Sequence, residues 1–198
     1  ASAKWLGLES EKRLANKGVS ACAVCDGFFF RGQEVAVVGG GDTAAEEALY
    51  LSKLSPKVHL LVRRDEMRAS KIMQDRVMKT ENIEIHWNTE AVEILGEDAV
   101  EGVKVVNNQT QEHTEIPIKG FFVAIGHKPN TDIFKDWLDM DEAGYIKTAD
   151  KTSKTNIKGV FASGDAQDHV YRQAVTAAGT GCMAALDAER YLTSEGII

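Results

Sequence analysis

The segment Val35–Ala44 constrains this chain most, because three consecutive glycines join a short apolar run to a helix-forming stretch. It reads Val-Ala-Val-Val-Gly-Gly-Gly-Asp-Thr-Ala, and residues rich in Ala, Glu and Leu follow it. Gly39, Gly41 and Ala44 fit the G-x-G-x-x-G/A spacing of dinucleotide sites. In this pattern the first glycine forms a tight turn and the second lets the backbone approach the pyrophosphate. The small third residue lets the helix pack close to the strand. Glycine-rich turns also end many strands for structural reasons alone. The strand–turn–helix order nevertheless predicts a dinucleotide site, with phosphates facing the helix N-terminus.

Arginines follow the next apolar strand, residues 57–62, at Arg63, Arg64 and Arg68. An NAD site usually has Asp or Glu at the end of this strand, where the carboxylate binds the ribose 2′-hydroxyl. Guanidinium groups instead match a 2′-phosphate, which a carboxylate would repel. Charges after a strand commonly mark only a solvated turn. At this spacing from the glycine turn, however, they indicate NADPH.

A dithiol precedes the glycine turn, in the segment Ser20-Ala-Cys22-Ala-Val-Cys25-Asp26-Gly27. We expect Ser20 to cap a short helical turn and Gly27 to end it. Thiols at a helix N-terminus are favoured as thiolates, and Asp26 could transfer a proton to or from a departing thiolate. The pattern predicts a redox-active pair. Two buried structural cysteines are the alternative.

No metal site is predicted. A single CxxC supplies half of a zinc site, and neither a second CxxC nor a paired histidine motif follows it. The histidines are scattered along the chain, at His59, His86, His113, His127 and His169.

The net charge of −7 argues against nucleic acid or an anionic membrane as the main partner. We find no apolar run long enough to span a bilayer and no secretory signal. The cysteines do not form a secreted disulfide framework, so a reducing cytoplasm is predicted. The start Ala-Ser-Ala-Lys, without Met, suggests the middle of a longer protein.

Short segments with alternating polarity occupy residues 82–118, and we expect residues 82–88, 90–95, 102–106 and 114–118 to form a small antiparallel unit on the parallel sheet. Residues 121–126 follow as a buried strand. Beyond them, one apolar strand at 159–163 and one helix at 173–192 are too little for a complete domain. The prediction is an α/β protein with a linker at 1–7, a domain at 8–126 and part of a second domain at 127–198.

Several motifs then follow one another in order: Ala21–Gly27, Val38–Ala44, Arg63–Arg68, Ala124–Asn130, Gly159–Ala166, Tyr171–Ala174 and Thr176–Cys182. Together they resemble the low-molecular-weight, bacterial type of thioredoxin reductase. The resemblance implies a Rossmann-like NADPH-binding domain, followed by the C-terminal part of a Rossmann-like FAD-binding domain. It also implies a homodimer that passes electrons from NADPH through FAD and the CxxC disulfide to thioredoxin. The family's N-terminal FAD fingerprint is not in this sequence, so we expect a fragment whose isolated activity is in doubt.

The resemblance also implies roles for single residues. Cys22 corresponds to the sulfur that exchanges with thioredoxin, Cys25 to the sulfur that faces the flavin, and Asp26 to the acid–base residue. The implied cofactor contacts are Gly39, Gly40, Gly41, Asp42, Thr43, Ala44, Arg63, Arg64, Arg68, Ile125, Gly126, Gly164, Asp165, Arg172, Gln173 and Ala174. Cys182 lies in a predicted helix and is expected to belong to the hydrophobic core.

Two other functions fit part of the pattern. The flavoprotein of alkyl hydroperoxide reductase shares this half of the fold, but that family is similar to enzymes that use NADH. The three arginines disfavour NADH and therefore this candidate. A non-catalytic NADPH-binding module is the other candidate, and the adjacent CxxC disfavours it for the parent protein.

Overall fold

The computed structural model describes all residues from 1 to 198 and divides them into two compact units. The larger unit comprises residues 3–126, and the smaller comprises residues 1–2 with 127–198. The contacts divide after Gly126, and residues 3–7 belong to the larger unit. β1 (Ser2–Ala3) and β10 (His127–Lys128) form a sheet of two strands.

A five-stranded parallel sheet forms the centre of the larger unit, with strand order β2-β9-β3-β4-β5. Its strands are β2 (Val19–Ser20), β9 (Gly120–Val123), β3 (Val35–Val38), β4 (Val58–Val62) and β5 (Ile83–Trp87). Every residue of β3, β4 and β9 is buried, as expected for parallel strands covered on both faces. The predicted α/β fold class is confirmed.

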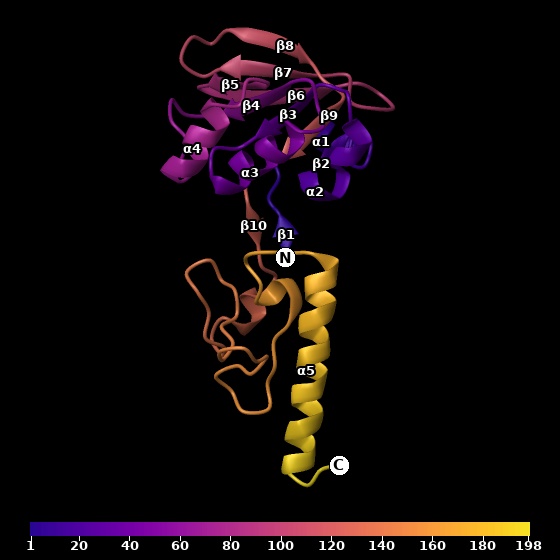
Figure 1. The fold of residues 1–198 in the computed structure, drawn as a ribbon, viewed down its shortest axis with the longest axis vertical. Coiled ribbons are helices and arrows are strands. Elements are labelled where there is room, and N and C mark those ends of the chain that lie inside the picture. The colour runs from indigo at the N-terminus through magenta and orange to yellow at the C-terminus, as the bar shows by residue number, and fades with distance from the viewer. The chain divides into compact units, whose positions relative to one another are not determined.

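Two helices, α3 (Asp42–Leu51) and α4 (Lys71–Met78), cover one face of this sheet (Figure 1). The core on this face combines alternate strand residues with the small side chains of α3, among them Val35, Val37, Leu60, Ala44 and Ala48. Two shorter helices, α1 (Glu9–Arg13) and α2 (Ala23–Asp26), contact β6 and α3 respectively.

A three-stranded antiparallel sheet covers the opposite face, with the order β6 (Thr89–Leu95), β7 (Gly102–Asn107) and β8 (His113–Pro117). The predicted antiparallel unit is therefore present, but it does not include residues 82–88. These residues form β5, which pairs in parallel with β4. The assignment was wrong because a half-exposed edge strand shows the same alternating pattern as an antiparallel strand.

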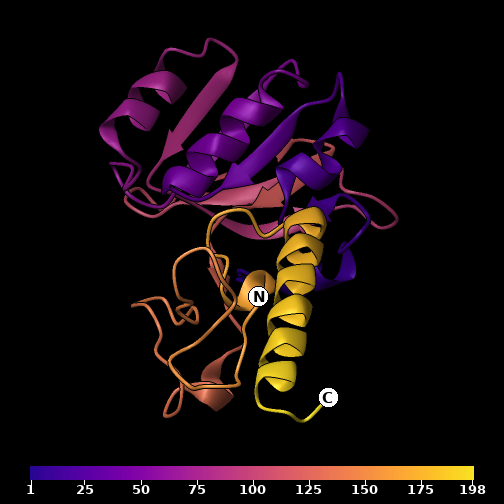
Figure 2. The ribbon, with the colours of Figure 1, turned by 60° about the horizontal axis from the view of Figure 1, so that its bottom comes forward.

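The smaller unit contains one long helix, α5 (Ala174–Ser194), beside loops with two short 3-10 turns (Figure 2). These turns are η2 (Asp132–Phe134) and η3 (Gly164–Ala166), and the unit's core cluster consists of Leu138, Ile146 and Ala162. The strand expected at 159–163 is not formed, since only Phe161 pairs there, in an isolated bridge with Lys154. An apolar run becomes a strand only beside a partner strand, and this unit offers none.

The exposure of α5 corrects a second expectation. None of its residues is buried, and Cys182, expected in a core, is exposed. Apolar side chains on this helix are exposed too, including Val175, Met183 and Leu186. The local pattern indicated an apolar helix correctly, but no sheet in this unit covers it. No helix of the chain combines the length and the apolar character that crossing a membrane requires.

Candidate dinucleotide site and redox disulfide

A cavity of about 480 Å³ opens in the larger unit where β3 and β4 end. The carboxyl ends of parallel strands are the usual place for a ligand in such sheets. Six of the predicted cofactor residues line it: Gly39, Gly40, Arg63, Arg64, Arg68 and Ile125. The structure therefore brings the glycine turn and all three arginines to one cavity.

Gly39 and Gly41 differ in the structural reason for which a glycine is needed. Gly39 has φ +150°, and a Cβ there would lie 2.4 Å from the carbonyl oxygen of Ala124 and 2.8 Å from Cβ of Ala44. Gly41 is the N-cap of α3 without a side-chain hydrogen bond, and a Cβ built on it would meet nothing within 4 Å. The fold itself requires Gly39, whereas Gly41 leaves open space over a helix N-terminus, as a bound pyrophosphate would need.

Hydrogen bonds fix the backbone of the arginine loop, whereas the arginine side chains form no ion pair. The side-chain amide of Asn108 donates to the carbonyl oxygen of Arg63 at 2.8 Å, and the backbone N–H of Asn88 donates to that of Arg64 at 3.0 Å. The side chains of Arg63, Arg64 and Arg68 are exposed, and none forms an ion pair within the chain. Their positive charge is therefore available to an anionic ligand.

Hydrogen bonds join the arginine loop to the glycine turn. The carbonyl oxygen of Gly40 accepts from the N–H groups of Arg68 at 2.6 Å and Ala69 at 3.1 Å. Oδ1 of Asp42 accepts from both the N–H and the hydroxyl of Ser70, each at 2.8 Å. Asp42, predicted to contact a cofactor, thus holds the end of the arginine loop.

Sequence reasoning missed Leu6 and Leu8, which also line the cavity. The buried carboxylate of Glu11 positions this segment, since it accepts from the N–H of Leu6 at 3.0 Å and of Gly7 at 2.9 Å. A glutamate amid charged neighbours gives no local signal of burial. Thr89, Glu66 and Glu90 also line the cavity without having been predicted.

Cys22 and Cys25 form a disulfide with a Cα–Cα distance of 5.3 Å. Cys22, and not Ser20, is the N-cap of α2, and its sulfur accepts from the N–H of Cys25 at 3.2 Å. The expected cap was wrong by two residues because Ser20 belongs to β2. Cys22 is half-buried and Cys25 exposed, which excludes the alternative of two buried structural cysteines.

Ser20 instead connects the disulfide to Asp26. Its Oγ accepts from the N–H of Cys22 at 3.0 Å and donates to Oδ2 of Asp26 at 2.6 Å. Gly27 ends α2 as expected, but with φ −58° the chain continues into the 3-10 turn η1 (Gly27–Phe30). Its lack of a side chain serves packing, because a Cβ would lie 2.8 Å from a methyl group of Leu51.

The remaining predicted residues lie in the smaller unit. Gly164 has φ +63° and donates its N–H to Oγ1 of Thr180 at 2.9 Å. The half-buried carboxylate of Asp165 lies 3.5 Å from the N-terminal ammonium. Arg172 has φ +48° directly before Gln173, the N-cap of α5, whose side chain forms a reciprocal capping box with Thr176.

His127 lies near two of these residues. Burial lowers the pKa of His127, the Arg172 guanidinium lowers it further, and the Asp165 carboxylate opposes both.

The chain was compared with known proteins. The family model of the pyridine nucleotide-disulphide oxidoreductases matches residues 1–181. Thioredoxin reductase of Coxiella burnetii is 54% identical over 98% of this chain and 63% of its own length. The NADPH-dependent thioredoxin reductase 3 of Arabidopsis thaliana is 52% identical over 100% of this chain and 38% of its own length.

The structure of thioredoxin reductase from Giardia duodenalis superimposes with a TM-score of 0.91 at 46% identity, over 97% of this chain and 63% of that one. This chain therefore spans less than two thirds of these relatives. The ordered motifs, the cavity and the family match together place it: the chain belongs to the pyridine nucleotide-disulphide oxidoreductase family.

Proposed function

We propose that this chain is the NADPH-binding and dithiol-bearing part of a thioredoxin-disulfide reductase. The observation that carries the proposal is one cavity lined both by the glycine turn and by three arginines without an ion-pair partner. The names of the similar proteins support it, since they are thioredoxin reductases. In this proposal the protein is a cytoplasmic homodimer.

The cavity fits NADPH on the chemistry of its lining. Residues Gly39–Ala44 would lie along the pyrophosphate, with Gly41 leaving room for close approach. Arg63, Arg64 and Arg68 would bind the 2′-phosphate, because guanidinium forks pair with phosphate oxygens in a bidentate manner. One lining residue, Glu66, favours NADH and with it the second candidate, an alkyl hydroperoxide reductase flavoprotein. With Glu90, two carboxylates line the cavity against three guanidinium groups, and this excess of positive charge favours NADPH.

The smaller unit supplies the residues proposed for FAD, namely Gly164, Asp165 and Arg172–Ala174. Asp165 is half-buried at a 3-10 turn, which suits a carboxylate that accepts hydrogen bonds from the ribityl hydroxyls. Bound flavin would supply two-electron transfer between nicotinamide and the disulfide.

The cysteines would then carry out thiol–disulfide exchange. Two electrons and two protons convert the Cys22–Cys25 disulfide into two thiols. The Cys22 thiolate attacks the thioredoxin disulfide, and Cys25 then displaces reduced thioredoxin and restores the Cys22–Cys25 disulfide. Asp26, oriented by Ser20, is placed to exchange the protons of these steps.

Calorimetric titration of the 198-residue chain with NADPH and with NADH tests the cofactor assignment. Wild type should bind NADPH more tightly, and Arg63→Gln/Arg64→Gln should lose NADPH affinity with little change for NADH. Each lost charge-assisted hydrogen bond corresponds to about 1.5–3 kcal/mol. Arg76→Gln/Lys79→Gln removes the same charge from exposed positions around the end of α4 and should leave both affinities unchanged.

Equal losses for both cofactors would show that the arginines do not recognise the 2′-phosphate. Tighter binding of NADH by the wild type would favour the second candidate. Flavin absorbance in the purified chain, and NADPH-dependent reduction of thioredoxin by the longer protein, test the rest of the proposal.

A further inference from the structure

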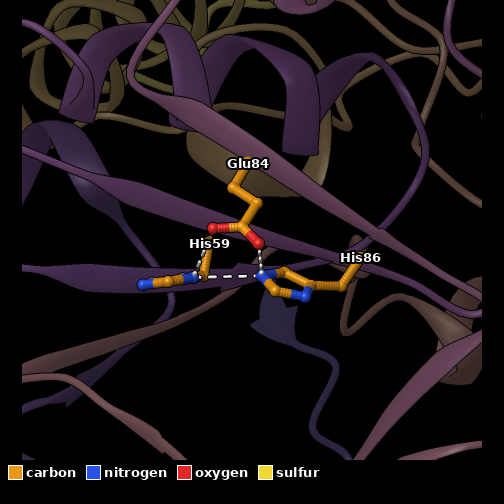
Figure 3. Close-up of side chains that lie close together, drawn as sticks. All are labelled: His59, Glu84 and His86. Atoms are coloured by element: carbon orange, nitrogen blue, oxygen red, sulfur yellow. Dashed lines mark hydrogen bonds and ion pairs between the residues drawn. The ribbon is translucent and has the colours of Figure 1, made fainter.

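Two histidines and a glutamate lie together on the parallel sheet, far from the cysteines in sequence. His59 lies on β4, and Glu84 and His86 lie on β5, with His59 paired to Glu84 and Leu61 to His86 in the parallel register. Alternate residues of a strand share a face, so all three side chains project from one face of the sheet (Figure 3). This is the face that the antiparallel sheet covers, since Leu61 belongs to the core cluster between the two sheets.

The three side chains converge on one point. Nδ1 of His59 and Nε2 of His86 are 3.0 Å apart. The Glu84 carboxylate directs one oxygen at each ring, with Oε2 3.9 Å from Nδ1 of His59 and Oε1 3.8 Å from Nε2 of His86 (Figure 3). Two imidazole nitrogens on a tetrahedral zinc ion, each bonded at about 2.0–2.1 Å, would lie about 3.3 Å apart. A shift of a few tenths of an ångström would therefore admit the ion.

A second carboxylate fixes the tautomer of the buried histidine. Nε2 of His59, a residue only 4% exposed, lies 3.1 Å from Oε2 of Glu34. Because a carboxylate only accepts, His59 carries its proton on Nε2 and presents the lone pair of Nδ1 to His86 and Glu84. Histidines that ligate metals are oriented by this same carboxylate–imidazole hydrogen bond.

The remaining charges suit a divalent cation. Lys57 forms an ion pair with Oε2 of Glu84, which leaves Oε1 free to ligate. The hydrogen bond from Lys57 lowers the pKa of Glu84, and burial lowers the pKa of His86. The cluster is open to solvent on the side of Glu84, whose side chain is 47% exposed, and a cavity of about 260 Å³ is lined in part by His86.

We propose that His59 Nδ1, His86 Nε2 and Glu84 Oε1 bind one Zn²⁺ ion, with water as the fourth ligand and Glu34 as the orienting carboxylate. Two imidazole nitrogens, one carboxylate oxygen and one water form a donor set that zinc accepts in tetrahedral geometry. The ion replaces the proton shared between the two rings. It connects edge strand β5 to β4 and thereby stabilises the larger unit.

The titration uses the oxidised 198-residue chain carrying Cys182→Ser, in which no free thiol competes for the metal. ZnCl₂ should bind with one-to-one stoichiometry and raise the melting temperature, as any ligand specific for the folded state does. Co²⁺ in place of Zn²⁺ should show the intense visible bands of a four-coordinate nitrogen and oxygen site. His86→Gln should abolish these bands, and Glu34→Gln, which leaves the ligands intact, should weaken affinity about 10–100-fold.

The matched control is His113→Gln, an exposed histidine on β8, which should bind Zn²⁺ like the wild type. Absence of the visible cobalt bands in the wild type would overturn the proposal without any variant. Zinc affinity unchanged in His86→Gln would overturn it as well, and would identify the cluster as a hydrogen-bonded network alone. Zinc affinity unchanged in Glu34→Gln would overturn the orienting role of Glu34.

Discussion

Asp42 and Ser70 are joined by two hydrogen bonds, each 2.8 Å long, that end on one carboxylate oxygen, Oδ1 of Asp42. Asp42 is the first residue of α3, and Ser70 ends the loop that begins at Arg63. The pair therefore fixes the arginine loop to the helix whose N-terminus faces the cavity. The distance between the backbone of the glycine turn and the arginines is therefore set by hydrogen bonds within the protein.

Ser70→Ala should weaken NADPH binding moderately. It removes the hydrogen bond from the Ser70 hydroxyl to Asp42 and keeps the one from the Ser70 N–H. The loss of one neutral hydrogen bond is about 1 kcal/mol, or roughly fivefold in affinity. The matched control is Ser52→Ala at the other end of α3, where the hydroxyl donates to the carbonyl oxygen of Leu49. Calorimetric titration checks this prediction, and equal affinities in Ser70→Ala and wild type would refute the anchoring role.

Gly39→Ala and Gly41→Ala should fail in different ways. Gly39→Ala brings a methyl group against the Ala124 carbonyl oxygen at a positive φ, and should destabilise the larger unit by about 2–3 kcal/mol. Gly41→Ala has open space and a φ of −97°, so stability should change little while NADPH affinity falls. Urea unfolding and calorimetric titration measure the two effects, and NADPH binding by Gly41→Ala at wild-type affinity would contradict the pyrophosphate assignment.

Cys25→Ser and Cys22→Ser should differ in how they react with thioredoxin, when each is studied with Cys182→Ser. Cys25→Ser should attack a thioredoxin activated as its mixed disulfide with thionitrobenzoate and remain covalently bound, since the resolving thiol is gone. Cys22→Ser should react more slowly. Release of the yellow thiolate and non-reducing electrophoresis measure both. Exposure alone would favour reaction at Cys25, which is the more exposed of the two cysteines. Faster trapping by Cys22→Ser would therefore reverse the assigned roles.

Asp187 should make the smaller unit sensitive to acid. Hydrogen bonds from the Ser153 hydroxyl and N–H hold the pKa of Asp187 below its ordinary value of 3.8. A lowered folded-state pKa contributes stability above the unfolded value and loses it as pH falls through the folded one. Asp187→Asn should therefore speed hydrogen exchange around Ser153 at neutral pH and differ less from wild type below pH 3.8. Asp136→Asn, at an exposed position, is the control, and a difference independent of pH would contradict the prediction.

Much of the candidate site could be predicted because its signals are local. The glycine turn, the arginines one strand later and the CxxC each lie within a few residues of sequence. The structure gathers the first two into one cavity at the ends of β3 and β4. Leu6 and Leu8 escaped prediction, because their position depends on hydrogen bonds to the buried Glu11.

The sequence by itself indicated β3, β4, β9, the helix after the glycine turn and the three antiparallel strands, because hydrophobic period and turn residues act over short distances. It gave no indication of α1, α4 or β2. The tertiary structure alone decided that residues 82–88 pair with β4, that residues 159–163 form no strand and that Cys182 is exposed. It also brought His59 and His86, 27 positions apart, to within 3.0 Å. Strand register and the presence of a covering partner are properties of pairs of segments, so the pattern of one segment cannot specify them.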